Sequence, residues 1–360
     1  MHILMTITDL GTGGAQRVFT HIANGFQNRG VKVSVATFER GNTKPSFQLN
    51  DSIEVQRLDQ HARSENVLQA VFNNVKRVKR LRATMAHSNP DVVISFGDQH
   101  NILSIIAAKM TGVPILVSER VDPSRHLIGK VWDKLRQMTY RHASDVIVQT
   151  KHVAEIISTN CRCQCTVIPN PIPRAITNPK GFGIITVGRL SYQKRQEDLI
   201  LAFAHLGDDV EGRVLTIVGA GERRKELEAL AKKLDVSDRT VFTGKLDDVT
   251  SALSNADIFV LPSRYEGFPN ALCEAMACGL ACVSYDCDSG PAEIIEHRKN
   301  GLLVPDGDVD ALTDTMRELI RDDALREAIA TEAVKVTQRY SVDAILDQWT
   351  SCIEKAMRKH

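Results

Sequence analysis

Two carboxylates in the second half of the chain lie directly after a predicted buried strand. Glu266 and Glu274 stand eight positions apart and follow the apolar run 258–261, which is typical of a parallel strand. A helix is expected to restart near Pro269, which places Glu266 on the connecting loop and Glu274 in the first helical turns. Ligands bind at this edge of an open α/β sheet. Because ionised carboxylates only accept hydrogen bonds, the pair suits sugar hydroxyls, whereas a phosphate would need cations nearby.

Those cations follow another predicted strand. Arg189 and Lys194 stand five positions apart, after the apolar run 184–187 and Gly188. A guanidinium offers a planar fork of donors and an ammonium a compact charge, so together they suit a diphosphate. Fixed cations also stabilise the charge that a nucleoside diphosphate acquires as it leaves. The nearest pair of aspartates, in the segment 286–288, precedes a glycine turn, so we expect neither a metal nor a cofactor. Ordinary surface charge is the alternative interpretation of the two cations.

Glycine-containing turns offer backbone amides to the same ligand. Gly13 and Gly14 precede a predicted helix, and amides at a helix start bind anions. Ser289 and Gly290 precede Pro291, which suits the first position of a helix and leaves the amides before it free. An ordinary strand-to-helix turn accounts for each segment equally well.

Two other kinds of site are not expected. Gln16 and Arg224 stand where the G-x-G-x-x-G pattern of a nicotinamide-binding loop needs its third glycine. Cys161, Cys163 and Cys165 alternate along a predicted strand, which would put all three on one face, but their spacing is not that of structural zinc and no fourth ligand is evident. We expect reduced thiols without a functional role.

Four of these segments together resemble the retaining glycosyltransferases of the GT-B fold, family 4. The segment 266–279 resembles the E-x7-E signature, 188–194 matches G-R-L-x-x-x-K, Gly13-Gly14 matches the family's glycine pair, and 288–293 resembles its Gly-Pro-Ala-Glu turn. The resemblance implies an α/β architecture of two Rossmann-like, doubly wound domains facing a central cleft. It also implies that Glu274 binds the nucleotide ribose and Glu266 the sugar hydroxyls, with Arg189 and Lys194 on the diphosphate. The rest of the implied donor site consists of Gly13, Gly14, Gly188, Gly267, Phe268, Asn270, Ser289 and Gly290.

The order of predicted elements agrees with that architecture. Strand-like apolar runs alternate with amphipathic helical segments on both sides of a proline-rich stretch at 168–173. We therefore expect an N-terminal acceptor-binding domain at 1–168 and a C-terminal nucleotide-sugar-binding domain at 176–339. The resemblance implies that a last helix, 340–360, crosses back onto the first domain.

The first half of the chain is basic. Residues 1–176 contain 22 Lys and Arg against 13 Asp and Glu (+9), whereas residues 177–360 contain 23 against 31 (−8). Pairing between the two halves is one explanation, and an anionic partner of the first half is the other. A helix with an apolar stripe from Val71 to Met85 carries many of these cations, and a second stripe runs from Ile128 to Met138. Each stripe is a core face or a membrane contact. The residues assigned to the acceptor and the membrane are Lys76, Arg77, Lys79, Arg80 and Arg120.

Three polar residues after first-domain strands are candidates for contacting the transferred sugar. Many members of the family have a histidine after the strand at 115–117, where this chain has Glu119 and Arg120. His100 follows the preceding strand. We therefore assign His100 and Glu119 to catalysis together with Glu266, Arg189 and Lys194, with a structural role as the alternative for each first-domain residue.

The sequence as a whole favours a retaining, metal-independent hexosyl or N-acetylhexosaminyl transferase. We expect a UDP-sugar donor, a polyprenyl-diphosphate-linked saccharide acceptor, an anionic membrane surface as a partner, and no nucleic acid. Without an apolar stretch of 18 residues or a leader before the first strand, we expect a cytoplasmic protein on the inner face of the plasma membrane. The alternatives are a sugar-nucleotide isomerase of the same architecture and a non-catalytic sugar-nucleotide or lipid-binding subunit.

Overall fold

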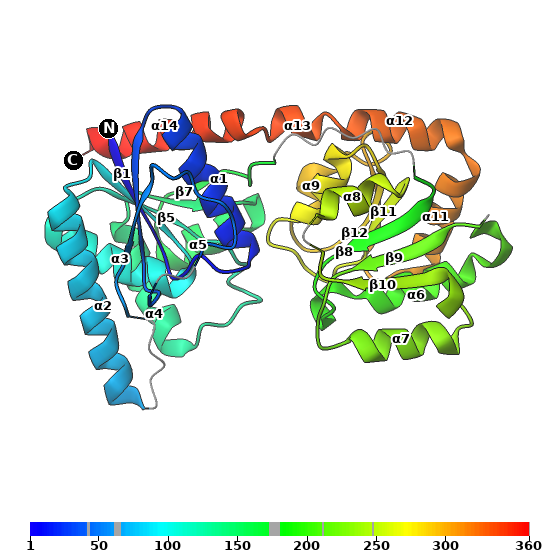
Figure 1. Ribbon diagram of the computed structural model, residues 1–360, viewed down its shortest axis with the longest axis horizontal. Coiled ribbons are helices and arrows are strands. Elements are labelled where there is room, and N and C mark those ends of the chain that lie inside the picture. The colour runs from blue at the N-terminus through cyan, green and yellow to red at the C-terminus, as the bar shows by residue number, and fades with distance from the viewer. Residues whose placement is uncertain (42–43, 61–65, 173–180, 211, 247, 360) are drawn as a thin grey trace. The chain divides into compact units, whose positions relative to one another are not determined.

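The computed structural model describes residues 1–360 except 42–43, 61–65, 173–180, 211, 247 and 360 (Figure 1). It divides into two compact units. Unit 1 comprises Met1–Pro171 and Val342–His360, and unit 2 comprises Ile172–Ser341. Pro173 of the predicted linker and the expected domain start at residue 176 lie outside the described residues.

Unit 1 contains a seven-stranded sheet in the order β3-β2-β1-β4-β5-β6-β7, in which every pair is parallel. The strands are β1 His2–Ile7, β2 Lys32–Thr37, β3 Glu54–Arg57, β4 Val92–Phe96, β5 Ile115–Ser118, β6 Asp145–Val148 and β7 Cys165–Val167. The five strands with continuous apolar runs were predicted from the sequence. The two edge strands, β3 and β7, were not, because they are short and only partly buried.

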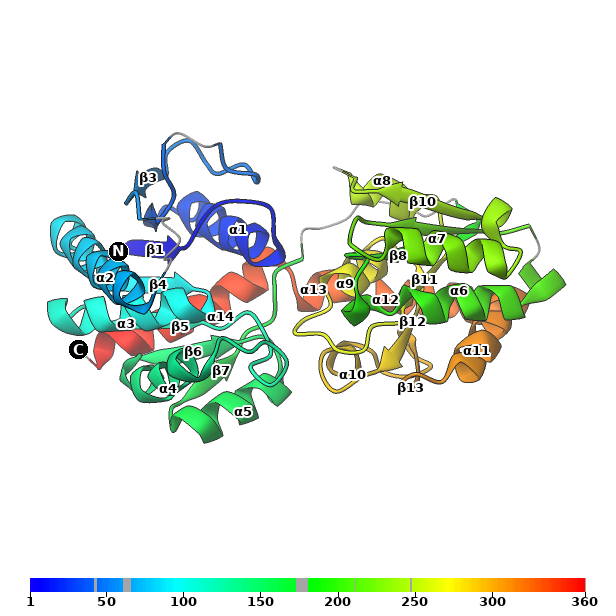
Figure 2. The ribbon, with the colours of Figure 1, turned by 90° about the horizontal axis from the view of Figure 1, so that it is seen from below.

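The helices of unit 1 form two groups. They are α1 Gly14–Asn28, α2 Val67–Ser88, α3 Asp98–Thr111, α4 Lys130–Thr139, α5 Lys151–Cys161, α14 Val342–Arg358 and the short 3₁₀ helix η1 Tyr140–His142. Neighbouring members of the series from α2 to α5 contact one another, and Figure 2 shows α2 and α3 side by side. α14 packs against α1, where Arg29 forms ion pairs with Asp343 and Asp347 at 2.9 and 2.6 Å. The C-terminal helix is therefore part of unit 1.

Unit 2 contains a six-stranded parallel sheet in the order β10-β9-β8-β11-β12-β13. The strands are β8 Gly183–Val187, β9 Val214–Val218, β10 Thr240–Gly244, β11 Ile258–Leu261, β12 Ala281–Asp286 and β13 Leu302–Pro305. Their side chains form a core with α6, α7 and α11, and α9 packs on β11 and β12. Figure 1 shows α6 and α7 below this sheet and α8 and α9 above it. Both units thus confirm the predicted doubly wound α/β class.

The helices of unit 2 connect consecutive strands and end the unit. They are α6 Gln196–His205, α7 Arg224–Lys233, α8 Val249–Ser254, α9 Asn270–Ala277, α10 Pro291–Ile294, α11 Val309–Arg321, α12 Asp323–Ala333 and α13 Val336–Arg339, with 3₁₀ helices η2 Tyr192–Lys194, η3 Gly207–Val210 and η4 Ser237–Arg239. α12 and α13 belong to one nearly continuous helical segment, 323–339. It is divided at Val334 and Lys335, where the bonds Lys335 N to Glu332 O and Thr337 N to Val334 O span three residues and tighten the turn.

The predicted cysteine strand is wrong. Cys161 is the last residue of α5, Arg162 adopts a left-handed conformation with φ of 50°, and only Cys165 belongs to β7. The helix extends through Cys161 because its apolar residues Val153, Ile157 and Cys161 recur at helical spacing and are buried. All eight cysteines are free thiols.

Candidate active site

The candidate site lies in unit 2 at the point where the strand order reverses. β8 and β11 are neighbours, but the connection that leaves β8 runs to β9 on one side and the connection that leaves β11 runs to β12 on the other. The segment 188–194 follows β8, and the segment 262–269 follows β11 and leads into α9. As predicted, Glu266 lies on this loop and Glu274 lies within the helix.

An ion pair joins these two segments. Lys194 Nζ lies 2.5 Å from Glu266 Oε1, and the side chains are only 19% and 6% exposed. Backbone contacts hold the pair in register, because Arg264 N donates to Gln193 O at 2.8 Å and Gln193 Nε2 donates to Tyr265 O at 2.9 Å. The sequence suggested separate positive and negative subsites. In the structure, the cation assigned to the diphosphate and the carboxylate assigned to the sugar are direct partners.

The turn before α10 closes around Glu266. The Ser289 hydroxyl donates a hydrogen bond to the Glu266 carbonyl oxygen. Gly290 has a φ of 99°, and a Cβ atom there would lie 2.9 Å from Pro269 Cδ and 3.4 Å from Glu266 Cβ. Only glycine fits this conformation and this approach without strain. The predicted donor residues Ser289 and Gly290 are thus next to Glu266.

Close backbone packing fixes the end of β8. Gly188 N donates to Val218 O at 2.9 Å, and a Cβ atom on Gly219, whose φ is 143°, would lie 1.9 Å from Gly188 O. A Cβ atom on Gly188 would lie 3.3 Å from the Lys194 side chain. The Lys194 methylenes therefore run along the glycine that begins the cationic segment.

Arg189 differs from the other arginines near this edge. Arg223 and Arg264 both bind Glu197, at 2.7 and 3.0 Å. Burial raises the pKa of Glu197, but these hydrogen bonds outweigh it and the pKa is lowered. Arg195 pairs with Asp306 at 2.7 Å. Within the described residues, the exposed Arg189 guanidinium makes no hydrogen bond or ion pair, so it is available to an anion.

The remaining predicted donor residues lie on the same loop and helix. Gly267 and Phe268 follow Glu266, and Asn270 begins α9. The Phe268 ring packs edge-on against Tyr340 with centroids 5.8 Å apart, which anchors the loop to the end of α13. Glu274 is half-buried on α9.

In unit 1, the predicted glycine pair begins α1. Gly13 is the extended N-cap and Gly14 the first helical residue. Among the described residues, no side chain caps this helix start, which leaves its first amides without an intrahelical partner. Because α1 follows β1, these amides lie at the carboxyl edge of the sheet. The anion site at these amides stays a prediction.

Glu119 does not reach that edge as a free carboxylate. It is fully buried, accepts a hydrogen bond from the Tyr140 hydroxyl at 2.8 Å, and lies 3.8 Å from Arg136. Burial, with a smaller contribution from Asp98, raises its pKa to about 7. The structure therefore supports the alternative role for Glu119, that of organising the packing of α4 and η1 on β5.

His100 is also a core residue. It is 3% exposed, its ring lies 4.6 Å from that of Phe38, and neither of its ring nitrogens has a hydrogen-bond partner within the described structure. Burial, assisted by the nearby Arg77 charge, lowers its pKa to about 3, so the ring is neutral. The catalytic role predicted for His100 would require it to leave this packing.

Arg120 and Arg77 were assigned to the acceptor and the membrane, but the structure does not place them on an exposed basic face. The Arg120 guanidinium donates to Asn170 Oδ1 at 2.6 Å and lies 4.4 Å from the Phe96 ring centroid, and burial lowers its pKa to about 9. Arg77 turns inward and donates to Gln60 O at 3.1 Å. The other three predicted cations, Lys76, Lys79 and Arg80, are exposed on α2.

Comparison with known proteins agrees with this architecture. The family described as glycosyl transferases group 1 matches residues 172–336, and the family described as glycosyl transferase 4-like domain matches residues 13–171. The two matches adjoin and together span almost the whole chain. The chain belongs to the GT-B glycosyltransferases.

Several relatives of this glycosyltransferase match it along its length. An α-1,4-N-acetyl-D-galactosaminyltransferase of Campylobacter jejuni, named for the acceptor GalNAc-α-(1→4)-GalNAc-α-(1→3)-diNAcBac-PP-undecaprenol, is 26% identical, with 98% of each chain covered. The lipopolysaccharide 1,6-galactosyltransferase of Salmonella typhimurium is 25% identical over 86% of this chain and 87% of the relative. Anabaena HepE, solved with UDP and glucose, superposes with a TM-score of 0.82 at 21% identity, covering 98% and 99% of the two chains. This glycosyltransferase thus resembles enzymes of lipid-linked oligosaccharide and polysaccharide synthesis.

Sequence reasoning missed the contacts that position the ion pair. The bonds of Gln193 to the segment 264–265, and the Glu197 bridge between Arg223 and Arg264, were not predicted. No local signal specifies them, because the partners lie 26 to 72 positions apart. Among the residues that the structure describes, there is no cluster of three His, Cys, Asp or Glu side chains suited to a metal ion.

Proposed function

We propose that this glycosyltransferase transfers a hexose or N-acetylhexosamine from a UDP-sugar, with retention of configuration, to a saccharide linked to polyprenyl diphosphate. The observation that carries the proposal is the Lys194–Glu266 ion pair beside the unpaired Arg189 at the switch point of unit 2. Arg189 and Lys194 bind the diphosphate, Glu266 accepts hydrogen bonds from the sugar hydroxyls, and Glu274 accepts them from the ribose. The departing diphosphate oxygen assists removal of the acceptor proton on the same face of the sugar.

The charge balance of the site supports this division of roles. The two cations, Arg189 and Lys194, balance the two carboxylates of the site, Glu266 and Glu274, so an incoming diphosphate finds its counter-charges on the cations. When a diphosphate binds, Lys194 can keep one donor on Glu266 and turn another to the phosphate, since an ammonium has three N–H groups. The lysine thereby couples the sugar-binding carboxylate to the leaving group, where negative charge develops.

These cations also underlie the proposal that transfer requires no metal. EDTA should leave the initial rate unchanged, and added Mg²⁺ or Mn²⁺ should not raise it. Loss of turnover in EDTA that is restored by either ion would contradict this part of the proposal.

The acceptor assignment rests on relatives and on one surface. Two Campylobacter relatives, matched over 98% and 91% of this chain, are named for undecaprenol-linked acceptors. In unit 1, the first nine residues of α2 include five exposed large apolar side chains, each between 46 and 83% accessible. They are Val67, Leu68, Val71, Phe72 and Val75. Figure 1 shows this end of α2 extending past α4.

This exposed stripe, which we call the α2 tip, has the character of a membrane contact. Its residues recur at helical spacing, whereas Leu81 and Met85 farther along the same stripe are buried in the core. Of the two predicted roles, the stripe is therefore a core face at Leu81 and Met85, whereas its exposed first part is free to contact a membrane. α2 contains no acidic residue, and Lys76 lies over the Phe72 ring at 4.3 Å. Apolar side chains flanked by cations favour an anionic bilayer. No helix in the described part of the chain has the length and hydrophobicity to span a bilayer.

Release of UDP tests the transferase assignment. With a lipid-linked acceptor, the full chain should release UDP from at least one UDP-sugar in proportion to new product, and the product anomer should match the donor in an NMR spectrum. Absence of acceptor-dependent UDP release across the common UDP-sugars would contradict the proposal.

Liposome flotation tests the membrane contact separately. The chain should float with vesicles containing anionic lipid and less with neutral ones, and the substitution of Leu68 and Phe72 by Ser should abolish flotation. A matched control replaces the exposed Val241 and Val334 of unit 2 by Ser and should float normally. Equal flotation of the two variants would contradict a role for the α2 tip.

A further inference from the structure

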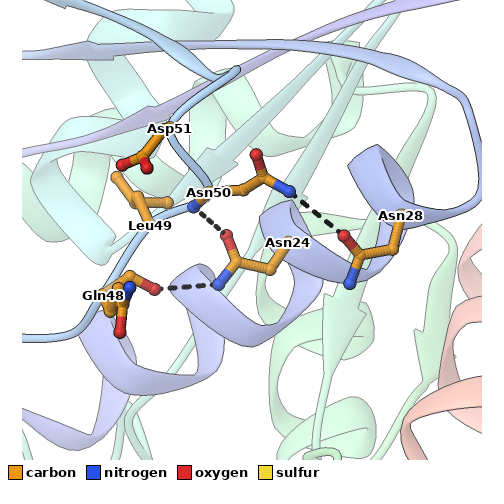
Figure 3. Close-up of a pocket in the computed structure, with 6 residues that line it drawn as sticks. All are labelled: Asn24, Asn28, Gln48, Leu49, Asn50 and Asp51. Atoms are coloured by element: carbon orange, nitrogen blue, oxygen red, sulfur yellow. Dashed lines mark hydrogen bonds between the residues drawn. The ribbon is translucent and has the colours of Figure 1, made fainter.

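A polar hollow lies in unit 1, away from the glycine turn that begins α1. It lies between α1 and the segment 48–51, has a volume of about 430 Å³, and is within the size range of small-molecule pockets (Figure 3). Its lining consists of Asn24, Asn28, Gln48, Leu49, Asn50 and Asp51. Four of the six carry side-chain amides, and Asp51 is the only charged one. We call it the amide hollow.

A chain of hydrogen bonds orients the amides. Asn24 Nδ2 donates to Gln48 O at 2.9 Å, Asn50 N donates to Asn24 Oδ1 at 2.8 Å, and Asn50 Nδ2 donates to Asn28 Oδ1 at 3.1 Å (Figure 3). Asn24 thereby uses both ends of its amide, one N–H and the oxygen, to hold the segment 48–50 against α1. Preorganised polar groups lose little freedom when a ligand binds.

Other groups of the lining remain available. Asn28 Nδ2, the Gln48 side-chain amide and the Asp51 carboxylate are exposed and make no hydrogen bond among the described residues. Together they offer N–H donors and oxygen acceptors within one concave surface. The hydrogen bonds among Asn24, Gln48 O, Asn50 and Asn28 Oδ1 hold the loop against α1. The Asn28 N–H groups, the Gln48 side-chain amide and the Asp51 carboxylate take no part in those bonds.

The chemistry of the lining selects the ligand. No lysine or arginine lines the amide hollow, so a phosphate or sulfate would find no counter-charge. Planar amides and one carboxylate match groups that both donate and accept, which is the pattern of neutral sugar hydroxyl and acetamido groups. A surface built to hydrogen-bond hydroxyls discriminates strongly against analogues that lack them.

The same segment leads back to the carboxyl edge of the unit 1 sheet, where α1 begins. An adjoining hollow of about 600 Å³ shares Gln48, Leu49, Asn50 and Asp51 and extends to Ser46 and Phe47. Unlike the amide hollow, it is also lined by two cations, Lys44 and Arg57. Ser46 N donates to Leu10 O at 2.9 Å, beside the turn that precedes Gly13. From Gly14 to Asn24 the rise along α1 is about 15 Å. A short oligosaccharide can span that length, with the partly buried Phe47 ring offering an apolar face to a sugar ring on the way.

We propose that the amide hollow is a binding subsite for neutral sugar residues of the acceptor, remote from the hydroxyl that reacts. This inference rests on the proposed function for the identity of the oligosaccharide, but not for the binding itself. It predicts that the enzyme prefers acceptors long enough to reach the amide hollow.

The test uses the full chain and two variants that spare the loop. Asn28→Asp keeps the oxygen that accepts from Asn50 and removes the N–H donors, and Gln48→Ala removes a side-chain amide while the backbone oxygen bound by Asn24 remains. Asn160→Ala, at an exposed asparagine on α5, is the matched control. Binding is measured on an array of immobilised neutral, sulfated and carboxylated oligosaccharides, with thermal melting to confirm folding.

Wild-type protein should bind neutral oligosaccharides, and each variant should bind them roughly fivefold more weakly, as expected for the loss of one hydrogen bond. The control should bind normally. In transfer assays, the KM for a long acceptor should rise by a similar factor while the KM for a monosaccharide acceptor and kcat stay unchanged. Unaltered binding in both variants, or wild-type binding only to anionic oligosaccharides or to none, would overturn the proposal. Neutral binding without UDP release from any acceptor would reject the proposed transferase function while leaving the subsite in place.

Discussion

The polar side chains that follow strands differ in burial between the two units. In unit 2, Lys194 and Glu266 are held against each other by loops that bond to one another, and both retain some contact with solvent. In unit 1, His100 and Glu119 lie in the core after β4 and β5, with burial as the first cause of each shifted pKa. A partly open ion pair can exchange partners with a ligand, whereas a fully desolvated group contributes to packing. Position after a parallel strand is therefore insufficient to make a residue part of a site.

The largest expected effect is on turnover in unit 2. Glu266→Gln and Lys194→Ala should each lower kcat/KM by about 10²- to 10³-fold, because each removes a fixed charge from the reacting groups. The exposed pair Glu296 and Lys299, at 2.7 Å, is the matched control, and Glu296→Gln and Lys299→Ala should leave turnover unchanged. Steady-state kinetics with melting curves separates lost activity from unfolding. Near-normal turnover in the first two variants would remove the proposed role of the pair.

A glycine substitution tests how rigidly unit 2 holds the site. Gly219→Ala should lower the free energy of unfolding by about 3 kcal/mol or more, since its Cβ would lie 1.9 Å from Gly188 O and its φ is unfavourable. At Gly212, φ is 79° and no atom lies within 4 Å of the added Cβ, so Gly212→Ala should cost only about 1 kcal/mol. Urea denaturation measures both. An equal loss of unfolding free energy in the two variants would show that the backbone at the end of β8 can move to accommodate the added Cβ atom.

In unit 1, the raised pKa of Glu119 predicts a pH dependence of stability. A folded carboxyl that titrates near pH 7 binds its proton more tightly than the same carboxyl in the unfolded chain, whose pKa is close to the ordinary value of 4.5. Its stabilising contribution is complete below pH 4.5 and is lost as pH rises toward 7, by about 3 kcal/mol in total. The difference in unfolding free energy between wild type and Glu119→Gln should therefore shift in favour of the variant from pH 5 to pH 8. A constant difference would mean that Glu119 titrates normally.

The smallest effect is expected at His100. Because both ring nitrogens are buried without partners, His100→Leu should change the unfolding free energy by less than about 1 kcal/mol, in either direction. Turnover should stay within about twofold, a change too small to reflect a lost transition-state contact. A hundredfold loss in kcat with a normal melting temperature would instead make His100 a catalytic residue and remove the contrast between the units.

Much of the architecture could be predicted because its signals are local. Continuous apolar runs such as Ile258–Leu261 indicate buried parallel strands wherever they occur, and the alternation with helical segments leads directly to two doubly wound sheets. Partly exposed edge strands such as β3 lack that signal. The stripe on α2 illustrates the same limit, since its period is identical in the exposed α2 tip and in the buried second half.

By itself, the sequence determined which residues follow which strands, and hence that Arg189, Lys194 and Glu266 share one edge of one sheet. Tertiary structure alone decided the contacts: Lys194 binds Glu266, and Arg189 has no partner in the part of the chain that the structure describes. It also decided that Glu119 is buried and bound by the Tyr140 hydroxyl. The physical reason is that strand and helix formation depend on neighbours a few positions away, whereas burial and ion pairing depend on groups brought together from distant parts of the chain.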